Sequence, residues 1–396
     1  MFIFRVLFFV VVCSQIIFAS DPRKTLGRPA GQDGGYGRRS VYVKDKRVLQ
    51  GDAVYSARSR TPLQSSYGTL TPSGLHFERH HAGIPDVDPS VHRVLVRGMV
   101  KNPKVYTVDD LKRFPSVIKQ YFLECAGNTR SEWKSELKAV NVQDTHGLMS
   151  HSEWVGVPLS TVLKHVGVDP KAVWVIVEGA DASGLIRSLP LSKCLDDVLI
   201  AYAQNGEPLR PEQGFPLRLV VPGWEGNCWI KWLTQLYVTD RPYMTQQETS
   251  KYTDLRKDGK ADQFTFTMGV KSVLTFPSGG EVLPGKGFYS LSGLAWSGHG
   301  KIIKVEVSVD GGRSWVLAKL STPIHTKSHT RFSYDWQWDG KPCVLQSRSY
   351  DDQGNRQPSR KELLKHGPQT DYHWNGIQSW SLDQEGNVKN HHEELL

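Results

Sequence analysis

The chain has 396 residues, a formal net charge of +9 and an apolar fraction of 39%. This length allows two or three domains with sizeable cores, and the excess of Lys and Arg favours acidic partners or anionic ligands. No basic helix or long Lys/Arg run occurs, which argues against nucleic acid as a partner. The twelve tryptophans and fourteen tyrosines either line an anion or cofactor pocket or pack a β-rich core.

The N-terminal segment has the composition of a targeting sequence followed by a linker. Residues 1–20 are almost all apolar, with Arg5 as the one charge, and predict a secretory signal peptide. An uncleaved membrane anchor competes with it, because the apolar run is nearly long enough to span a membrane. Residues 21–70 are rich in Gly, Arg, Ser and Pro and predict an extended arm or linker. Within it, Arg38-Arg39 lacks the apolar stretch of a Tat signal, which leaves the export route and the true start open.

Residues 71–260 show the alternation of strands and helices that is typical of a mixed α/β region. Alternating apolar residues predict a strand over residues 91–100, and Thr107 predicts the N-cap of a helix. A second helix is expected to end near Gly167, and residues 173–177 predict a buried strand.

A lone cysteine follows a predicted strand. Residues 121–123 are apolar or aromatic, Cys125 comes two positions later, and the chain then turns through Gly127-Asn128. Such a thiol can point into a cavity while the backbone curls around it. Residue types alone leave two interpretations, a thiolate ligand for a metal and a buried structural cysteine.

The other cysteines and a histidine-rich loop give weaker signals. No CxxC pair occurs, so the chain encodes neither a zinc ribbon nor a covalent c-type haem. Besides Cys125, the cysteines that remain after signal removal are free to form disulfides, although nothing forces one; they are Cys194, Cys228 and Cys343. Three histidines lie between residues 76 and 81 and suggest either a metal site or a polar loop, and no second cluster of ligand spacing supports the metal.

From about residue 268 the sequence changes to short alternating strands. Residues 302–309 alternate strictly, and Asp-Gly-Gly at residues 310–312 predicts a hairpin turn. About seven such strands suggest an immunoglobulin-like sandwich. Three tryptophans in these strands are expected to be exposed and to favour a dimer; they are Trp296, Trp336 and Trp338.

Three sequence blocks, in order, resemble the sulfite oxidase family of molybdopterin enzymes. Residues 121–130 (YFLECAGNTR) resemble its cysteine loop, residues 76–81 (HFERHH) its Phe-x-Arg-Asn-His loop, and residues 213–233 its run from His-Gly-Phe-Pro-x-Arg to Lys-Trp-Leu. The resemblance extends from about Gly74 to the C-terminus and is greatest to the sulfane dehydrogenase catalytic subunits of the sulfur-oxidising pathway, the SoxC branch. It implies an α+β protein, with a mixed α/β molybdopterin-binding oxidoreductase domain over residues 71–260 and an immunoglobulin-like β-sandwich dimerisation domain over residues 265–396.

The resemblance also implies roles for individual residues. It predicts a molybdenum–molybdopterin cofactor, with the metal bound by Cys125 and bordered by the hydroxyl of Tyr252. Arg79 is expected in the substrate oxyanion pocket, and Arg218 and Lys231 suit a terminal phosphate dianion. Catalytic roles fall to Arg79, Cys125 and Tyr252. The implied cofactor-binding residues are Phe77, Arg79, His80, His81, Cys125, Asp181, Gln213, Arg218, Trp229, Ile230 and Lys231.

Two of these residues have a plainer alternative, and four positions depart from the sulfite oxidase pattern. Asp181 could instead be a turn residue, and Tyr252 an ordinary aromatic between domains. The departures are histidine for asparagine at His80, glutamine for histidine at Gln213, lysine for aspartate at Lys251, and glycine in place of a second active-site arginine at Gly376. The last three agree with the SoxC branch, and the loss of the arginine implies a wider pocket for a larger, less charged sulfur donor.

The implied function is oxidation of a sulfane sulfur held on a carrier-protein cysteine, with oxygen taken from water. Because the chain has no haem motif, electrons are expected to pass to a dihaem cytochrome c subunit resembling SoxD, in a periplasmic assembly that is a homodimer core or a heterotetramer. The main alternative is a sulfite dehydrogenase that forms sulfate. Sulfoxide reduction belongs to single-domain relatives, and the sandwich argues against it. Apart from any family, a secreted binding protein with a sandwich module fits the composition, and a molybdenum assay distinguishes it.

Overall fold

The computed structural model describes residues 39–40, 42–50, 55–134, 136–137, 140–256, 258–366 and 373–392. Contacts divide the chain into residues 1–44 and residues 45–396, and every helix and strand named below belongs to the second unit. The predicted signal peptide over residues 1–20 lies outside the described residues. Within the described ranges, no helix is long and apolar enough to cross a membrane.

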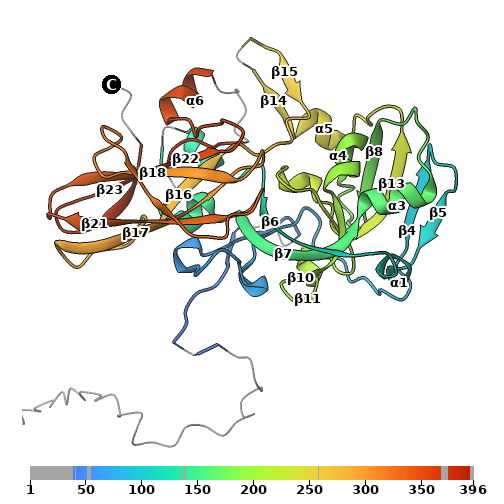
Figure 1. Ribbon diagram of the computed structural model, residues 1–396, viewed down its shortest axis with the longest axis horizontal. Coiled ribbons are helices and arrows are strands. Elements are labelled where there is room, and N and C mark those ends of the chain that lie inside the picture. The colour runs from blue at the N-terminus through green and yellow to red at the C-terminus, as the bar shows by residue number, and fades with distance from the viewer. Residues whose placement is uncertain are drawn as a thin grey trace, which may run out of the picture. The chain divides into compact units, whose positions relative to one another are not determined.

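The first half of this unit is built on two sheets with short helices beside them (Figure 1). One sheet has the order β5-β4-β13-β8-β9, in which only β4 and β13 run parallel. The other is antiparallel, with the order β11-β10-β7-β6 and β12 paired to β10. The elements are β4 (Val94–Gly98), β5 (Lys104–Tyr106), α1 (Val108–Lys112), β6 (Val117–Glu124), α2 (Val142–His146), β7 (Met149–Pro158), α3 (Leu159–Val166), β8 (Trp174–Gly179), β9 (Ile186–Pro190), α4 (Leu191–Asp196), β10 (Leu199–Gln204), β11 (Glu207–Pro208), β12 (Arg218–Val220) and β13 (Leu233–Thr239).

Local sequence signals explain where the helices begin and end. Thr107 caps α1 as predicted: its hydroxyl accepts from the Asp110 N–H, and the Asp110 carboxylate accepts from the Thr107 N–H. Helix α3 ends at Gly167, which has φ of +71° and donates its N–H to the carbonyls of Leu163 and Lys164. Both predicted helices are therefore confirmed.

Two further groups of strands flank this half in the sequence. Before it, β1 (Val48–Gln50), β2 (Arg58–Arg60) and β3 (Glu78–Arg79) form a small antiparallel sheet. After it, helix α5 (Gln246–Ser250) leads into a hairpin of β14 (Thr253–Leu255) and β15 (Ala261–Gln263).

The second half is a sandwich of two antiparallel sheets, as the alternating strands predict. One sheet has the order β16-β17-β21-β20, and the other the order β19-β18-β22-β23-β24. The elements are β16 (Lys271–Phe276), β17 (Gly287–Trp296), β18 (Ile302–Ser308), β19 (Val316–Leu317), β20 (Lys319–Leu320), β21 (Thr330–Trp338), β22 (Cys343–Asp351), α6 (Arg360–His366), β23 (Ser379–Leu382) and β24 (Val388–His391). The predicted fold class is thus confirmed.

The expectation that the sandwich tryptophans are exposed is wrong. Trp296 and Trp338 are almost fully buried, and Trp336 is 9% exposed. On β21, Trp336 and Trp338 are two positions apart and share the face that packs inward against Tyr289 of β17. These three side chains belong to the core of the sandwich and not to an exposed surface.

The paired strands β6 and β7 contribute to both halves of the unit (Figure 1). Because side chains alternate along a strand, Phe122 packs into the sandwich core and Leu123 into the core of the first half. At the start of β7, Met149 packs into the sandwich core, and Leu148 just before it packs into the core of the first half. The strand that ends beside Cys125 is therefore fixed from two sides.

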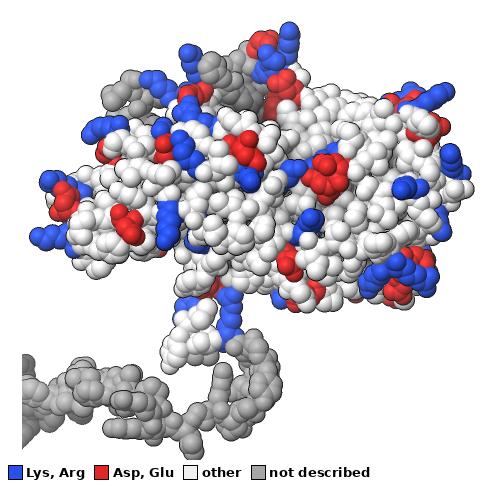
Figure 2. Space-filling model, viewed as in Figure 1, with Lys and Arg blue, Asp and Glu red and all other residues white. Residues whose placement is uncertain are grey.

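Charged residues of both signs are interspersed on the visible face of the molecule. Figure 2 shows Lys and Arg beside Asp and Glu over both halves rather than gathered in one field. The net positive charge therefore does not form one patch on this face.

Candidate active site

One pocket in the first half is lined by all twelve residues to which the resemblance gives a catalytic or cofactor role. About 710 Å³ of space between its atoms is unfilled, part of it open to solvent. The structure brings together residues that lie up to 175 positions apart, from Phe77 to Tyr252. Their roles stay predictions, while their common location is an observation. The twelve are Phe77, Arg79, His80, His81, Cys125, Asp181, Gln213, Arg218, Trp229, Ile230, Lys231 and Tyr252.

Cys125 lies at one end of the pocket, directly after β6. Its N–H donates to the Leu148 carbonyl at 3.0 Å, and its carbonyl accepts from the Asn128 N–H at 2.8 Å. Burial raises the pKa of the thiol, and the nearby positive charge of Arg79 opposes that rise. The thiol would therefore stay protonated in the free protein, whereas a bound metal ion would deprotonate it. The described cysteines are all unpaired.

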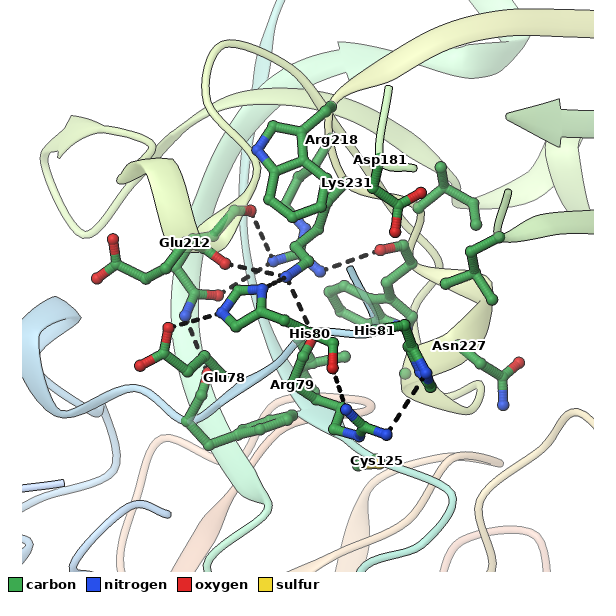
Figure 3. Close-up of a pocket in the computed structure, with 18 of the residues that line it drawn as sticks. Glu78, Arg79, His80, His81, Cys125, Asp181, Glu212, Arg218, Asn227 and Lys231 are labelled. Atoms are coloured by element: carbon green, nitrogen blue, oxygen red, sulfur yellow. Dashed lines mark hydrogen bonds and ion pairs between the residues drawn. The ribbon is translucent and has the colours of Figure 1, made fainter. Parts of the chain in front are cut away.

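Arg79 brings a positive charge to the same end of the pocket as Cys125 (Figure 3). Strand β3, which carries Arg79, pairs with β2, and the guanidinium donates to the Ser56 hydroxyl at 3.2 Å and to the His80 carbonyl. Its Nη2 lies 3.4 Å from Nδ1 of His81. These contacts fix the arginine at the mouth of the pocket, where it can attract an anion.

Lys231 lies at the other end of the pocket, and its ammonium is surrounded by neutral acceptors (Figure 3). Its Nζ donates to Nδ1 of His80 at 3.0 Å, to the Glu212 carbonyl at 3.1 Å and to the Arg79 carbonyl at 3.2 Å. Burial, and next the charge of Arg218, lower the pKa of Lys231 to about 7. This ammonium is therefore poorly compensated, and a bound dianion would relieve it.

Arg218 is also deeply buried, between the rings of Trp154 and Trp229. Its Nη1 donates to the carbonyl and the side-chain oxygen of Gln213, its Nη2 donates to the Trp229 carbonyl, and its Nε has no protein partner. Burial lowers the pKa of Arg218 to about 9. Gln213 in turn donates to the Phe77 carbonyl at 2.9 Å, so both ends of its amide already have protein partners.

His80 links Lys231 to a carboxylate. Its Nδ1 accepts from Lys231 and its Nε2 donates to Glu78 at 2.7 Å, which defines the neutral tautomer. Burial opposes ionisation of Glu78, but the hydrogen bond from His80 and the charge of Arg47 outweigh it and lower the pKa of Glu78 to about 2. His76 is instead stacked on Phe77, and no group of three or more His, Cys, Asp or Glu among the described residues could hold a metal ion. The histidine-rich stretch is therefore a structured polar segment that includes strand β3.

The wall of the pocket contains a strained residue and a close backbone approach. Trp232 has φ of +52°, which is rare for a bulky residue, and its ring lies 4.4 Å from the Lys231 ammonium. A side chain at Gly214, which has φ of +106°, would lie 3.0 Å from Cβ of Lys231. The local backbone is thus shaped around the lysine.

Asp181 and Tyr252 complete the sides of the pocket. Asp181 follows β8 and accepts from the Ser183 hydroxyl at 2.5 Å. Tyr252 follows α5, and its ring lies 5.1 Å from the guanidinium of the buried Arg187. Lys251 beside it is exposed to solvent. The described lining residues end at Tyr252 in chain order, so Gly376 is not among them.

Several lining residues were not predicted as site residues. Glu78 and Trp232 lie within the motif blocks that carry the resemblance. Each is next in sequence to a predicted site residue, Arg79 or Lys231, and this position could have identified them. Glu212 contributes its backbone carbonyl, which side-chain chemistry does not reveal. The remaining unpredicted residues are Leu123, Leu185, Gly226 and Asn227.

The residues present fit a cofactor with an anionic tail and a thiolate-binding metal. The Cys125 thiol, which becomes a soft thiolate ligand when a metal deprotonates it, faces one end of the pocket. Two buried cations with lowered pKa values lie at the other end. Nε of Arg218 is buried and without a protein partner, which is the signature of a donor that awaits an acceptor.

Two family models match successive parts of the chain. Residues 81–247 match the oxidoreductase molybdopterin binding domain, and residues 262–364 match the Mo-co oxidoreductase dimerisation domain. The structure is similar to the crystal structure of the sulfane dehydrogenase SoxCD from Paracoccus pantotrophus, with a TM-score of 0.91 and 42% sequence identity over 94% of this chain and 97% of that chain.

Nitrate reductases are also among the relatives. The NADH nitrate reductase of Brassica napus is 32% identical over 73% of this chain and 35% of its own length. NADH nitrate reductase 1 of Arabidopsis thaliana is 30% identical over 79% of this chain and 38% of its own length. The chain therefore spans little more than a third of these relatives.

Proposed function

Because the chain belongs to the sulfite oxidase family of molybdopterin-dependent oxidoreductases, we propose that it is the catalytic subunit of a sulfane dehydrogenase. Its substrate is a sulfane sulfur bound to a carrier-protein cysteine, its oxygen comes from water, and its electrons pass to a c-type cytochrome subunit. The observation that carries this proposal is the likeness to SoxCD, which covers nearly the whole of both chains. The nitrate reductases share only part of their length with this chain.

Different pocket residues would bind different parts of the cofactor. Cys125 would bind the metal, while Arg218 and Lys231 would bind the terminal phosphate with charge-assisted hydrogen bonds. Asp181 offers a carboxylate to the N–H groups of a pterin. When bound, the molybdenum centre supplies two-electron redox chemistry coupled to oxygen-atom transfer.

Arg79 is the residue suited to orient the substrate. Each oxygen that a sulfane sulfur gains from water releases two protons and two electrons, and the negative charge of the sulfur group moves onto its oxygens. Arg79, beside Cys125, can attract that charge as it develops. No second arginine lines this end among the described residues, which leaves room for a sulfur carried on a protein.

Export and partners complete the proposal. The apolar residues 1–20 support export to the periplasm, where carrier and cytochrome would be met. A mature N-terminus that still contains these residues, found by mass spectrometry of the periplasmic protein, would contradict signal cleavage. The matched dimerisation domain supports a homodimer core, with the cytochrome subunit completing a heterotetramer. A monomeric mass by light scattering at micromolar concentration would contradict the dimer.

Steady-state cytochrome c reduction tests the substrate. The enzyme with a partner haem subunit is given either free sulfite or a carrier-protein cysteine persulfide, and nitrate reduction is measured with a reduced dye. The persulfide is expected to be by far the best substrate, and Arg79→Ala to suppress its turnover. Arg97→Ala is the matched control, because Arg97 is an exposed arginine on β4 outside the pocket. Efficient turnover of free sulfite without a carrier would make the protein a sulfite dehydrogenase, and nitrate turnover a nitrate reductase.

A further inference from the structure

A buried lysine from the sandwich closes the loop that carries Cys125. Lys271 is the first residue of β16 and is fully buried. Its Nζ donates to Oε1 of Glu124 at 2.7 Å and to Oγ1 of Thr129 at 2.9 Å. Glu124 and Thr129 bracket residues 125–128, so one ammonium joins both ends of the cysteine loop.

The Glu124 carboxylate accepts hydrogen bonds from two further residues besides Lys271. Its Oε2 accepts from the indole N–H of Trp296 at 2.7 Å, and its Oε1 also accepts from the Asn128 amide at 2.9 Å. The Thr129 hydroxyl, which accepts from Lys271, donates to the Trp374 carbonyl at 2.9 Å. Trp296 and Trp374 belong to the second half of the unit, so three residues from that half hold the loop.

The loop ends in a backbone conformation that needs such support. Thr129 has φ of +62°, and a left-handed conformation is unfavourable for a β-branched residue. Such a conformation persists only where its surroundings enforce it. The contacts of the Thr129 hydroxyl and its N–H bond to the Thr145 carbonyl at 3.0 Å provide that enforcement.

A buried ion pair is a weak device for stability, because the desolvation of two charges offsets most of their attraction. Fixing one conformation is what such a pair does well when all of its hydrogen bonds are satisfied. Here the fixed segment carries the thiol that faces the pocket. The geometry assigns Lys271 the part of a positioning residue: through Glu124 and Thr129 it sets the cysteine loop so that the Cys125 thiol meets the metal. This inference rests on the proposed role of Cys125 as metal ligand.

The consequence is that the first half does not hold the site alone. Lys271 lies 146 positions after Cys125 and belongs to the half that matches a dimerisation domain. A shift of β16 would therefore reach the metal ligand through two hydrogen bonds.

Three variants test the assignment. Lys271→Met removes the ammonium at similar volume. Thr129→Val removes the hydroxyl that accepts from Lys271 and donates to the Trp374 carbonyl, but it keeps the side-chain shape and leaves the ion pair intact. Lys327→Met is the matched control, because Lys327 of the second half pairs with Asp197 of the first half at 2.6 Å, and Asp197 is not part of the cysteine loop.

The deciding measurements use the cofactor-free, full-length protein. Hydrogen exchange at the amides of residues 125–129 and the alkylation rate of the Cys125 thiol are followed well below the unfolding temperature. Lys271→Met and Thr129→Val are expected to accelerate both by about tenfold or more, as for the loss of a hydrogen bond to a charged group. Lys327→Met is expected to leave both at the wild-type rate. In the loaded enzyme, Lys271→Met should lower kcat per molybdenum more than it changes KM and alter the absorption bands of the metal centre.

Wild-type exchange and alkylation rates in both loop variants would overturn the assignment, and so would equal acceleration in Lys327→Met. If Lys271→Met does not fold, Thr129→Val decides alone. A fully active Cys125→Ser enzyme would refute the proposed ligand role, and that result is independent of the loop measurements on the cofactor-free protein.

Discussion

The two ends of the pocket hold their charges in opposite ways. At the cysteine end, the buried ammonium of Lys271 faces the buried carboxylate of Glu124, and both have short hydrogen bonds. At the other end, Lys231 and Arg218 are both cations, and the atoms that contact them are carbonyls, an amide and a neutral imidazole. The Lys271–Glu124 pair is complete without a ligand, whereas Lys231 and Arg218 carry positive charge that a dianion would neutralise. The difference shows which buried charges fix the shape of the site and which ones bind a ligand.

The largest effect is expected at the cysteine end. Cys125→Ser should abolish turnover and leave the unfolding midpoint nearly unchanged, because serine keeps the volume but not the soft thiolate. Activity per molybdenum and thermal unfolding measure the two parts. Cys343→Ser is the control, a half-buried cysteine in the sandwich that should keep full activity. Normal turnover in Cys125→Ser would contradict the proposed role of Cys125 as the metal ligand.

At the other end, loss of a cation should cost cofactor before it costs chemistry. Lys231→Ala removes a charge-assisted contact worth about 1.5–3 kcal/mol, which is roughly a tenfold to hundredfold loss of affinity. Molybdenum and pterin content should fall, while activity per molybdenum stays near the wild-type value. Lys193→Met removes another buried lysine that does not line the pocket and should keep full cofactor content. Full pterin content in Lys231→Ala would contradict the proposed phosphate site.

The pH dependence of cofactor binding sharpens the same contrast. In the cofactor-free protein the pKa of Lys231 is about 7, so above pH 7 the amine is neutral and must take up a proton to bind a dianion. Affinity should therefore fall by up to about tenfold per pH unit above 7, and below about pH 6 the phosphate itself loses charge. Calorimetry in buffers of different ionisation enthalpy should detect the proton uptake. The fall above pH 7 should vanish in Lys231→Met, and an unchanged pH profile in that variant would assign the titration elsewhere.

The smallest effect is expected at His80. His80→Asn restores the asparagine of the family pattern and keeps an oxygen that can accept from Lys231, but it loses the bond to Glu78. A hydrogen bond to an ionised carboxylate is worth about 1.5–3 kcal/mol, but this one joins two protein groups and does not contact the cofactor, so cofactor content should fall only slightly. Pterin content measured beside that of Lys231→Ala gives the comparison, and an equal loss in both would show that His80 holds more than the lysine.

The sequence predicted the local features of this site better than its long-range contacts. The turn after Cys125, the helix caps and the strands follow from residues close in sequence, and the motif blocks identified ten of the twelve predicted lining residues. The other two, Asp181 and Tyr252, lie outside these blocks. The partner of Glu124 could not be predicted, because Lys271 lies 147 positions away and looks like any strand-edge lysine. The predicted exposure of the sandwich tryptophans was wrong for a similar reason. Alternation defines the two faces of a strand but does not show which face is buried.

X-ray absorption at the molybdenum edge tests the central claim most directly, because it reports the atoms bound to the metal. The loaded wild-type enzyme and Cys125→Ser are compared at equal molybdenum and pterin content, with Cys343→Ser as control. The account predicts the loss of one sulfur neighbour in Cys125→Ser alone. The same number of sulfur neighbours in all three proteins would contradict it, because the thiol at the end of β6 would then not be the ligand.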